Sequence, residues 1–267
     1  MELLVSVRSG AEVAAALGGG ADIIDAKEPN RGSLGAVSSD VLGAILERVP
    51  PQRTLSVALG DFTRPDDVRI AIESLLIASR EAATYVKLGF AGLSRGEVIT
   101  TLLESAVAAA GSHLAAPRIV AVAYADARLA GTALPDFICR AAAHAGAAGV
   151  LFDTHTKGSG NLLTWLERGT LAALVAGCRR EGLLTAVAGS LQVEHLGMVA
   201  SALPDIVGFR GAACIGGRAG RVSRRRVQQL RHAVRNADSG FIQDWVPSRQ
   251  GMGGETPEAR ANLCQPD

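Results

Sequence analysis

Three lysines stand out in a chain that otherwise carries its positive charge on arginine. Among the 27 lysines and arginines of the 267-residue sequence, only Lys27, Lys87 and Lys157 are lysines. Arginine stays protonated and forms no imine with a carbonyl compound, whereas a lysine amine with a lowered pKa is an effective nucleophile. The scarcity of lysine therefore predicts that these three positions serve chemistry rather than surface charge.

Carboxylates accompany the lysines along the chain. Lys27 follows a predicted buried strand in the segment ADIIDAKEPNRGSLG, and Asp25 lies two residues before it. Residues i and i+2 of a strand share a face, so we expect this carboxylate and this amine side by side. Asp153 ends a later predicted strand, four residues before Lys157. Repulsion among clustered amines should lower the pKa of at least one, with the carboxylates acting as acids, bases or iminium partners.

Three more residues follow predicted strands and are candidates to line the same site: Asp61, Asp126 and His155. A simpler interpretation stays open, because a single lysine at a strand end is most often an ion-pair partner. Asp25 and Asp153 can likewise serve only to cap loops. The placement of all three lysines on one predicted rim favours the chemical interpretation.

Two glycine-bearing segments predict a phosphate site. Gly189 and Ser190 follow the seventh predicted strand, and Arg210, Gly211 and Ala212 follow the eighth. Backbone amides exposed by glycine beside a helix N-terminus bind phosphate at this corner of many βα barrels, and Arg210 can add a charge-assisted contact. The alternative is that the glycines only permit tight turns.

Short apolar runs alternate with alanine-rich helical windows along the chain. The predicted strands cover residues 3–7, 21–26, 54–59, 84–88, 118–124, 149–153, 184–188 and 205–209. The predicted helices cover residues 11–17, 39–47, 66–80, 97–110, 135–145, 162–181, 194–200 and 223–236. Strands that are apolar throughout are typical of parallel sheets covered on both faces.

Eight such units predict a single (β/α)₈ TIM barrel over residues 1–238. A doubly wound sheet would need a G-x-G-x-x-G turn after the first strand, where the chain has Arg8, Ser9 and Gly10. The carboxyl ends of parallel strands share one edge, so Lys27, Lys87 and Lys157 should converge there. Residues 239–267 are polar and rich in glycine, which predicts a tail that is partly disordered or docked.

Composition argues against several classes of function. A net charge of +1 provides no field for nucleic acid or an acidic membrane surface. The arginine-rich run 218–226 lacks interleaved aromatic residues, so we interpret it as a solvated loop and helix face. The four cysteines form no C-x-x-C pair and the histidines are dispersed, so we expect neither a metal site nor a disulfide framework.

The chain shows no signal peptide and no apolar run of membrane-spanning length. We therefore expect a cytoplasmic protein that acts on a small molecule, with no nucleic-acid or membrane partner. A homo-oligomer is compatible with the sequence.

Segments at nearly every predicted strand end resemble those of the (5-formylfuran-3-yl)methyl phosphate synthase family. In order, they are ADIIDAKEPNRGSLG, YVKLGF, AYADA, FDTHTKGSG, AVAGSL and DIVGFRGAAC. The resemblance runs from residue 3 to about residue 234. It implies a barrel enzyme that is a carbon–oxygen lyase and needs no cofactor. The implied reaction condenses two glyceraldehyde 3-phosphate molecules into a phosphorylated furan aldehyde, with loss of phosphate and water. The product would serve methanofuran biosynthesis.

The resemblance also implies roles for individual residues. Lys27 corresponds to the imine-forming lysine, Lys87 to a proton acceptor, and Asp153 and Lys157 to residues that support acid and base steps. An imine on Lys27 acidifies the next carbon, so a base can remove a proton and a β-phosphate can leave. The carbon nucleophile then adds to a second aldehyde, and dehydration closes the furan. Ile215 stands where the family is associated with a basic residue, which leaves the phosphate contacts open.

Three rival interpretations remain. A class I aldolase acting on phosphorylated aldehydes needs the same amine but eliminates no phosphate. A barrel of the D-x-K-x-x-D type would want a second acid where the chain has Asn30. A non-catalytic phosphate-binding barrel would gain nothing from lysine, because arginine binds phosphate at least as well.

Overall fold

Eight parallel strands close into a barrel in the computed structural model, which describes residues 1–80, 82–112 and 116–239. The strands are β1 (Glu2–Val7), β2 (Ile23–Ala26), β3 (Thr54–Asp61), β4 (Tyr85–Gly89), β5 (Arg118–Tyr124), β6 (Gly149–Asp153), β7 (Leu184–Val187) and β8 (Ile206–Phe209). Each strand pairs with the next in the sequence, and β8 pairs with β1 to complete the closure. The predicted (β/α)₈ barrel is confirmed.

The apolar strands are buried on both faces. Every residue of β2, β4 and β6 is buried, which explains why these strands show no polar alternation. One set of side chains packs outward against the helices in a large core cluster. A second cluster, with Leu4, Ile23, Val122 and Ile206 among its members, fills the inside of the barrel. Each strand is therefore held in place by packing of its side chains on both faces of the sheet.

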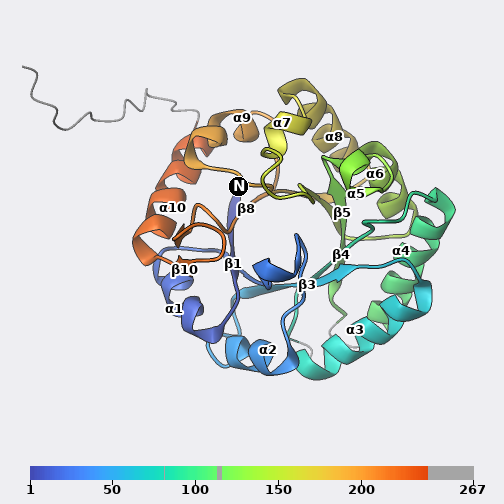
Figure 1. The fold of residues 1–267 in the computed structure, drawn as a ribbon, viewed down its shortest axis with the longest axis horizontal. Coiled ribbons are helices and arrows are strands. Elements are labelled where there is room, and N and C mark those ends of the chain that lie inside the picture. Colours follow the sequence, from blue (N-terminus) through green and yellow to red (C-terminus); the bar gives the residue numbers. More distant parts are fainter. Residues whose placement is uncertain (81, 113–115, 240–267) are drawn as a thin grey trace, which may run out of the picture.

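The helices form a ring around the strands (Figure 1). Those that match single predicted windows are α1 (Gly10–Gly18), α2 (Ser39–Leu46), α3 (Pro65–Ser79), α4 (Gly96–Gly111), α6 (Pro135–His144) and α10 (Arg224–Asp238). The helix predicted at 194–200 begins as the 3₁₀ turn η2 (Val193–His195) and continues as α9 (Leu196–Ala200).

The single helix predicted at 162–181 is wrong, because the structure has two. A short helix, α7 (Leu162–Trp165), is capped by the side chain of Asn161 and is followed by α8 (Arg168–Arg180). Between them the backbone of Leu166 is extended while its side chain is buried. Because Leu166 is apolar and buried, the helical spacing of apolar residues continues across the break, and the sequence pattern does not reveal it.

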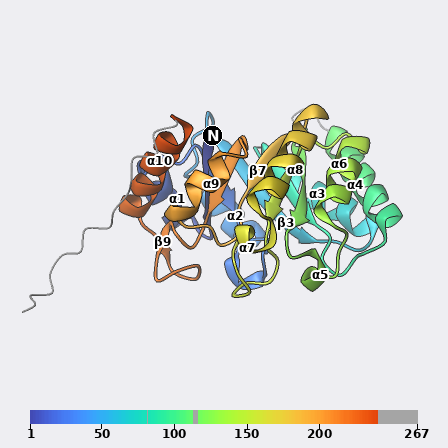
Figure 2. The same cartoon turned by 90° about the horizontal axis from the view of Figure 1, so that it is seen from above.

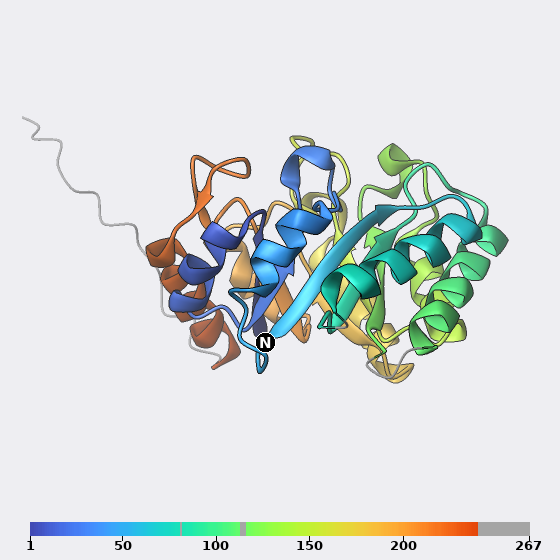
Figure 3. The ribbon, with the colours of Figure 1, turned by 90° about the horizontal axis from the view of Figure 1, so that it is seen from below.

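Three short elements lie at the carboxyl edge of the barrel and were not predicted from the periodicity. They are the 3₁₀ turn η1 (Pro29–Arg31), α5 (Ala127–Ala130) and the hairpin of β9 (Cys214–Ile215) with β10 (Arg221–Val222). Figures 2 and 3 show all three projecting from the edge opposite the N-terminus. The loops after β2, β5 and β8 therefore build the wall around the barrel mouth.

Residues 240–267, which contain nearly all of the predicted polar tail, lie outside the described residues. None of the described helices has the length and apolar character needed to cross a membrane.

Candidate active site

A cavity of about 350 Å³ opens at the carboxyl edge of the barrel. Lys27, Lys87 and Lys157 all line it, together with Asp25 and Asp153, so the barrel brings these five predicted site residues into one pocket. The deeper wall consists of apolar side chains from inside the barrel: Leu4, Val120, Leu151 and Ile206. An apolar pocket with a few converging charged groups is the usual form of a small-molecule site.

Asp25 lines the same cavity as Lys27, but it forms its ion pair with Lys87. Its Oδ1 lies 2.5 Å from Lys87 Nζ, and its Oδ2 accepts a hydrogen bond of 2.8 Å from Ser6 Oγ. Burial alone would raise the pKa of Asp25, but the lysines Lys87 and Lys27 and these contacts hold it below its usual value. Asp25 is therefore a carboxylate inside the barrel, with Lys87 as its counter-ion.

Half-buried Lys157 and buried Asp153 form a second pair. Lys157 Nζ lies 3.2 Å from Asp153 Oδ1 and also donates to the carbonyl oxygen and hydroxyl group of Thr154. Burial opposes ionisation of Asp153, but Lys157, Lys27 and the Thr154 amide keep its pKa below the usual value. An ammonium group has three hydrogens, so Lys157 is fully engaged by these acceptors.

Lys27 is the lysine without a close partner. Within the described part of the chain no carboxylate lies within 4.0 Å of its Nζ, although its side chain is only 7% exposed. Burial lowers the pKa of Lys27 to about 8, with further lowering by Lys87 and Lys157 against the opposing effect of Asp153 and Asp25. The lowered pKa agrees with the expectation from the sequence, but burial is a larger cause than repulsion among the amines.

Asp61 and Asp126 hold loops and do not line the cavity, contrary to their candidacy for the lysine site. Asp126 accepts two hydrogen bonds of 2.7 Å from the backbone N–H groups of His155 and Thr156. The His155 ring packs edge-on against Tyr124, at 5.1 Å between centroids, and is also absent from the cavity wall. Asp126 thereby shapes the loop that carries Lys157, a role the sequence did not reveal.

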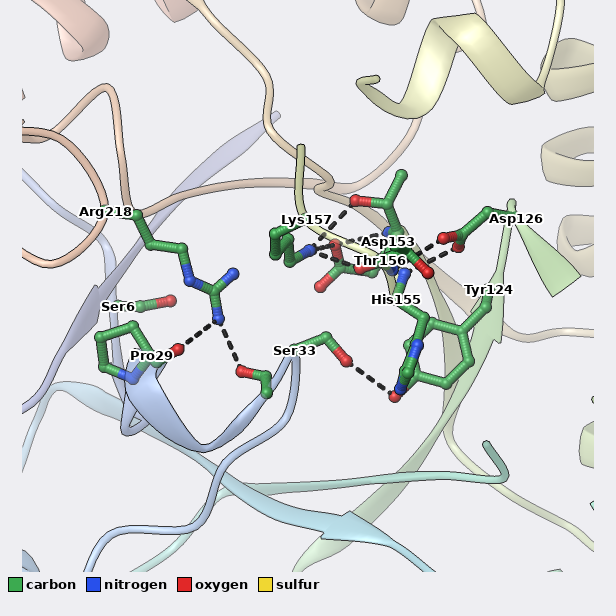
Figure 4. A network of polar contacts seen from close by, with 12 residues as sticks. Ser6, Pro29, Ser33, Tyr124, Asp126, Asp153, His155, Thr156, Lys157 and Arg218 are labelled. Atoms are coloured by element: carbon green, nitrogen blue, oxygen red, sulfur yellow. Dashed lines mark hydrogen bonds and ion pairs between the residues drawn. The ribbon is translucent and has the colours of Figure 1, made fainter. Parts of the chain in front are cut away.

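A hydrogen-bond chain ties the loop after β2 to the ends of β5 and β3, and Figure 4 shows its first contact, between Ser33 and Tyr124. Ser33 Oγ donates to Tyr124 OH at 3.0 Å, and Tyr124 OH donates to Asp61 Oδ1 at 2.8 Å. Burial, followed by the charge of Asp61, raises the pKa of Tyr124 well above its usual value. Gly89 leaves the space for this contact, since a Cβ there would lie 2.3 Å from Asp61 Oδ1. The loop after Lys27 is thereby fixed at Ser33.

Only some residues of the predicted phosphate site line the cavity. Gly189, Ser190 and Gly211 line the cavity, whereas Ala212 does not. Gly189 and Ser190 both have positive φ, 101° and 53°, which turns the chain sharply after β7. For serine this left-handed conformation is uncommon and is a feature of constrained functional loops. The glycine and serine therefore shape the corner, and phosphate binding there stays a prediction.

Arg210 is a structural residue, which corrects its assignment as a phosphate helper. Its five N–H groups all have acceptors: both carboxylate oxygens of Glu12, at 2.5 and 3.1 Å, and the carbonyl oxygens of Ser6, Arg218 and Gly220. A guanidinium group has five hydrogens, so none remains for a ligand. The partner carboxylate, in α1, was not foreseen because it lies 198 residues away in the sequence.

The residues of the cavity wall that the sequence analysis missed include two arginines and a serine. Arg218 and Arg226 belong to the arginine-rich run that was interpreted as a solvated surface, yet both line the cavity. Ser56 is buried in the wall, and its hydroxyl has no hydrogen-bond partner among the described residues. The glycines around Arg218, in the sequence GGRAG, were a signal that this loop lies close to other chain segments.

The described residues contain no group of three His, Cys, Asp or Glu side chains suited to hold a metal ion. The chemistry accessible to the site is that of one free amine beside two carboxylate–ammonium pairs. Such a set can form an imine and move protons around it.

The family model described as 4-HFC-P synthase matches residues 3–231. The relative from Methanothermobacter thermautotrophicus named (5-formylfuran-3-yl)methyl phosphate synthase is 36% identical over 237 residues, which cover 88% of this chain and 99% of the relative. The one of the same name from Methanocaldococcus jannaschii is 35% identical over 234 residues, or 86% of this chain and 98% of the relative.

Solved structures similar to the chain are barrel enzymes. Phosphoribosyl anthranilate isomerase from Thermus thermophilus aligns with a TM-score of 0.59 at 15% identity, over 88% of this chain and 99% of that chain. For 3-hexulose-6-phosphate synthase the TM-score is 0.58 at 19% identity, over 88% and 100%. At these identities the likeness concerns the fold alone.

Proposed function

The chain belongs to the 4-HFC-P synthase family, and we propose on that premise that it makes (5-formylfuran-3-yl)methyl phosphate from two molecules of glyceraldehyde 3-phosphate. The observation that carries the proposal is Lys27, a buried amine without a counter-ion among the described residues and with a pKa of about 8. It lies in one cavity with the pairs Asp25–Lys87 and Asp153–Lys157.

The proposed reaction balances without a redox step. Two triose phosphates contain six carbons and two phosphates, and the product keeps six carbons and one phosphate, so one phosphate and two water molecules leave. The three-carbon unit that ends in the formyl group has lost its phosphate. The other unit joins through its central carbon. The second triose therefore reacts as its ketone isomer, whereas the sequence led us to expect a second aldehyde.

The residues of the site match the steps that this reaction needs. Lys27 attacks the aldehyde carbon of the first triose and forms an imine, which acidifies the neighbouring carbon. The Asp25–Lys87 pair accepts that proton, after which the β-phosphate leaves as an anion. Asp153 and Lys157 exchange the protons that are required for isomerisation of the second triose and for the loss of water. This makes the enzyme a carbon–oxygen lyase.

Incubation of the purified protein with glyceraldehyde 3-phosphate alone tests the proposal. We expect one free phosphate and one furan aldehyde, detected by its absorbance, for every two substrate molecules consumed. A six-carbon sugar phosphate without free phosphate would instead identify a class I aldolase. Tight binding without any turnover would identify a non-catalytic phosphate-binding barrel.

The rate of imine formation is expected to rise with pH up to about 8 and to level off above it. Because burial lowers the pKa of Lys27 to about 8, roughly a tenth of the amine is neutral at pH 7. For a lysine with the ordinary pKa of 10.5 the neutral fraction at that pH is roughly 300 times smaller. Reductive trapping of the adduct between about pH 6 and about pH 10 measures the profile. A midpoint near 10.5 would contradict the assignment of Lys27.

A further inference from the structure

The cavity carries more positive charge than its own carboxylates balance. Six cationic side chains line it, against two acidic ones: Lys27, Lys87, Lys157, Arg210, Arg218 and Arg226, with Asp25 and Asp153. Lys87, Lys157 and Arg210 each have a carboxylate partner. Among the residues that the structure describes, none pairs with Lys27, Arg218 or Arg226 within 4.0 Å. Because the pKa of Lys27 is lowered to about 8, the charge that persists above this pH lies on the two arginines.

Arg218 extends from the β9–β10 hairpin across the mouth of the cavity to the loop that follows Lys27 (Figure 4). Its Nη2 donates to the carbonyl oxygens of Pro29 and Gly32, at 3.0 and 2.6 Å. Its Nε and Nη1 groups have no acceptor among the described residues, in contrast to Arg210, whose five hydrogens are all used. Three N–H groups of Arg218 are therefore available to a ligand.

The surroundings of Arg218 favour an anion. Its guanidinium group is partly buried, and burial lowers its pKa because the charged form loses hydration, while Asp153 acts in the opposite direction. A phosphate group would restore the lost stabilisation through charge-assisted hydrogen bonds from the free N–H groups of Arg218. The Asp153 carboxylate is already paired with Lys157, so it is not the anion that pairs with Arg218.

We propose that Arg218 binds a phosphate group of the substrate through the N–H groups that its Nη2 leaves free, on Nη1 or on Nε, while Nη2 holds the loop after Lys27 in place. The inference rests on the proposed function for the identity of the substrate as a triose phosphate. It assigns to Arg218 the side-chain contact that the sequence analysis had placed on Arg210. It also links recognition of the phosphate to the position of the imine-forming lysine, because Pro29 and Gly32 belong to the loop that follows Lys27.

Calorimetric titration with glycerol 3-phosphate tests the contact without catalysis, because this phosphate ester has no carbonyl group and cannot form an imine. We expect Arg218→Ala in the full chain to bind it about 10- to 100-fold more weakly than the unaltered protein. Arg218→Lys keeps the charge but has a single nitrogen atom, which cannot serve the loop and the phosphate from separate donor groups, and it should recover only part of the affinity. The matched control is Arg221→Ala, an exposed arginine of the same hairpin that lies outside the cavity wall.

Binding by Arg218→Ala within twofold of the unaltered protein would overturn the inference. So would an equal loss in Arg221→Ala, since that result would reflect net charge rather than a site, or the absence of binding by the unaltered protein. Turnover of glyceraldehyde 3-phosphate is measured in parallel. Loss of binding in Arg218→Ala, together with no furan from the unaltered protein, would keep the phosphate contact and reject the proposed function. Furan formation by Arg218→Ala with unchanged substrate affinity would keep the proposed function and reject the phosphate contact.

Discussion

Lys27→Arg is expected to lower furan formation by at least about 10⁴-fold, the order of loss that follows removal of a covalent nucleophile. The substitution keeps a positive charge and a long side chain at a position that has no ion pair to lose within the described residues. A guanidinium group stays protonated and cannot form an imine, so the first bond of the proposed reaction is never made. The loss should therefore appear in catalysis rather than in folding.

Borohydride added during turnover measures this directly, because it reduces the imine to a stable adduct that mass spectrometry locates. The unaltered protein should carry the adduct on Lys27, and Lys27→Arg should carry none. Lys87→Arg is the matched control: it removes the amine paired with Asp25, so it should still form the adduct on Lys27 but turn over slowly. An adduct on Lys87 or Lys157 would reassign the nucleophile, and full activity of Lys27→Arg would remove the imine mechanism.

Arg210→Ala is expected to destabilise the fold by about 3–5 kcal/mol, the usual cost of removing one partner of a buried ion pair. Both side chains of the Glu12–Arg210 pair are about 5% exposed, and the guanidinium group makes all five of its hydrogen bonds inside the protein. Without it the Glu12 carboxylate keeps, among the described residues, only the N–H groups of Arg8 and Val222 as donors. A buried charge with so few donors costs several kcal/mol.

Denaturant unfolding measures the free energy of each variant. Arg140→Ala is the control, because Arg140 forms an exposed pair with Asp136 on one turn of α6 and should cost only about 0.3–0.5 kcal/mol. The double variant Glu12→Leu with Arg210→Met should recover much of the loss, since it leaves no unpaired charge. A cost below about 1 kcal/mol for Arg210→Ala would show that water or another group compensates Glu12.

The barrel and the place of its site were determined by local sequence. Strands buried on both faces must be apolar along their whole length, and helices must repeat every three to four residues, so eight alternating units predict a closed parallel sheet. Parallel strands end at the same edge, which makes the order of residues sufficient to bring Lys27, Lys87 and Lys157 together. The family motifs at the same strand ends identified the family without the need for any side-chain geometry.

The partners of the charged groups were decided by the tertiary structure alone. Spacing along β2 predicted that Asp25 lies beside Lys27, but inside a closed barrel side chains also meet across the sheet, and Lys87 from β4 reaches Asp25. Arg210 and Arg218 both follow β8, yet all five hydrogens of Arg210 are bound, two of them by Glu12 in α1. Arg218 uses only its Nη2 hydrogens within the described part of the chain. Donors and acceptors that are far apart in the chain compete for each other only after folding, and burial then decides which charge stays uncompensated.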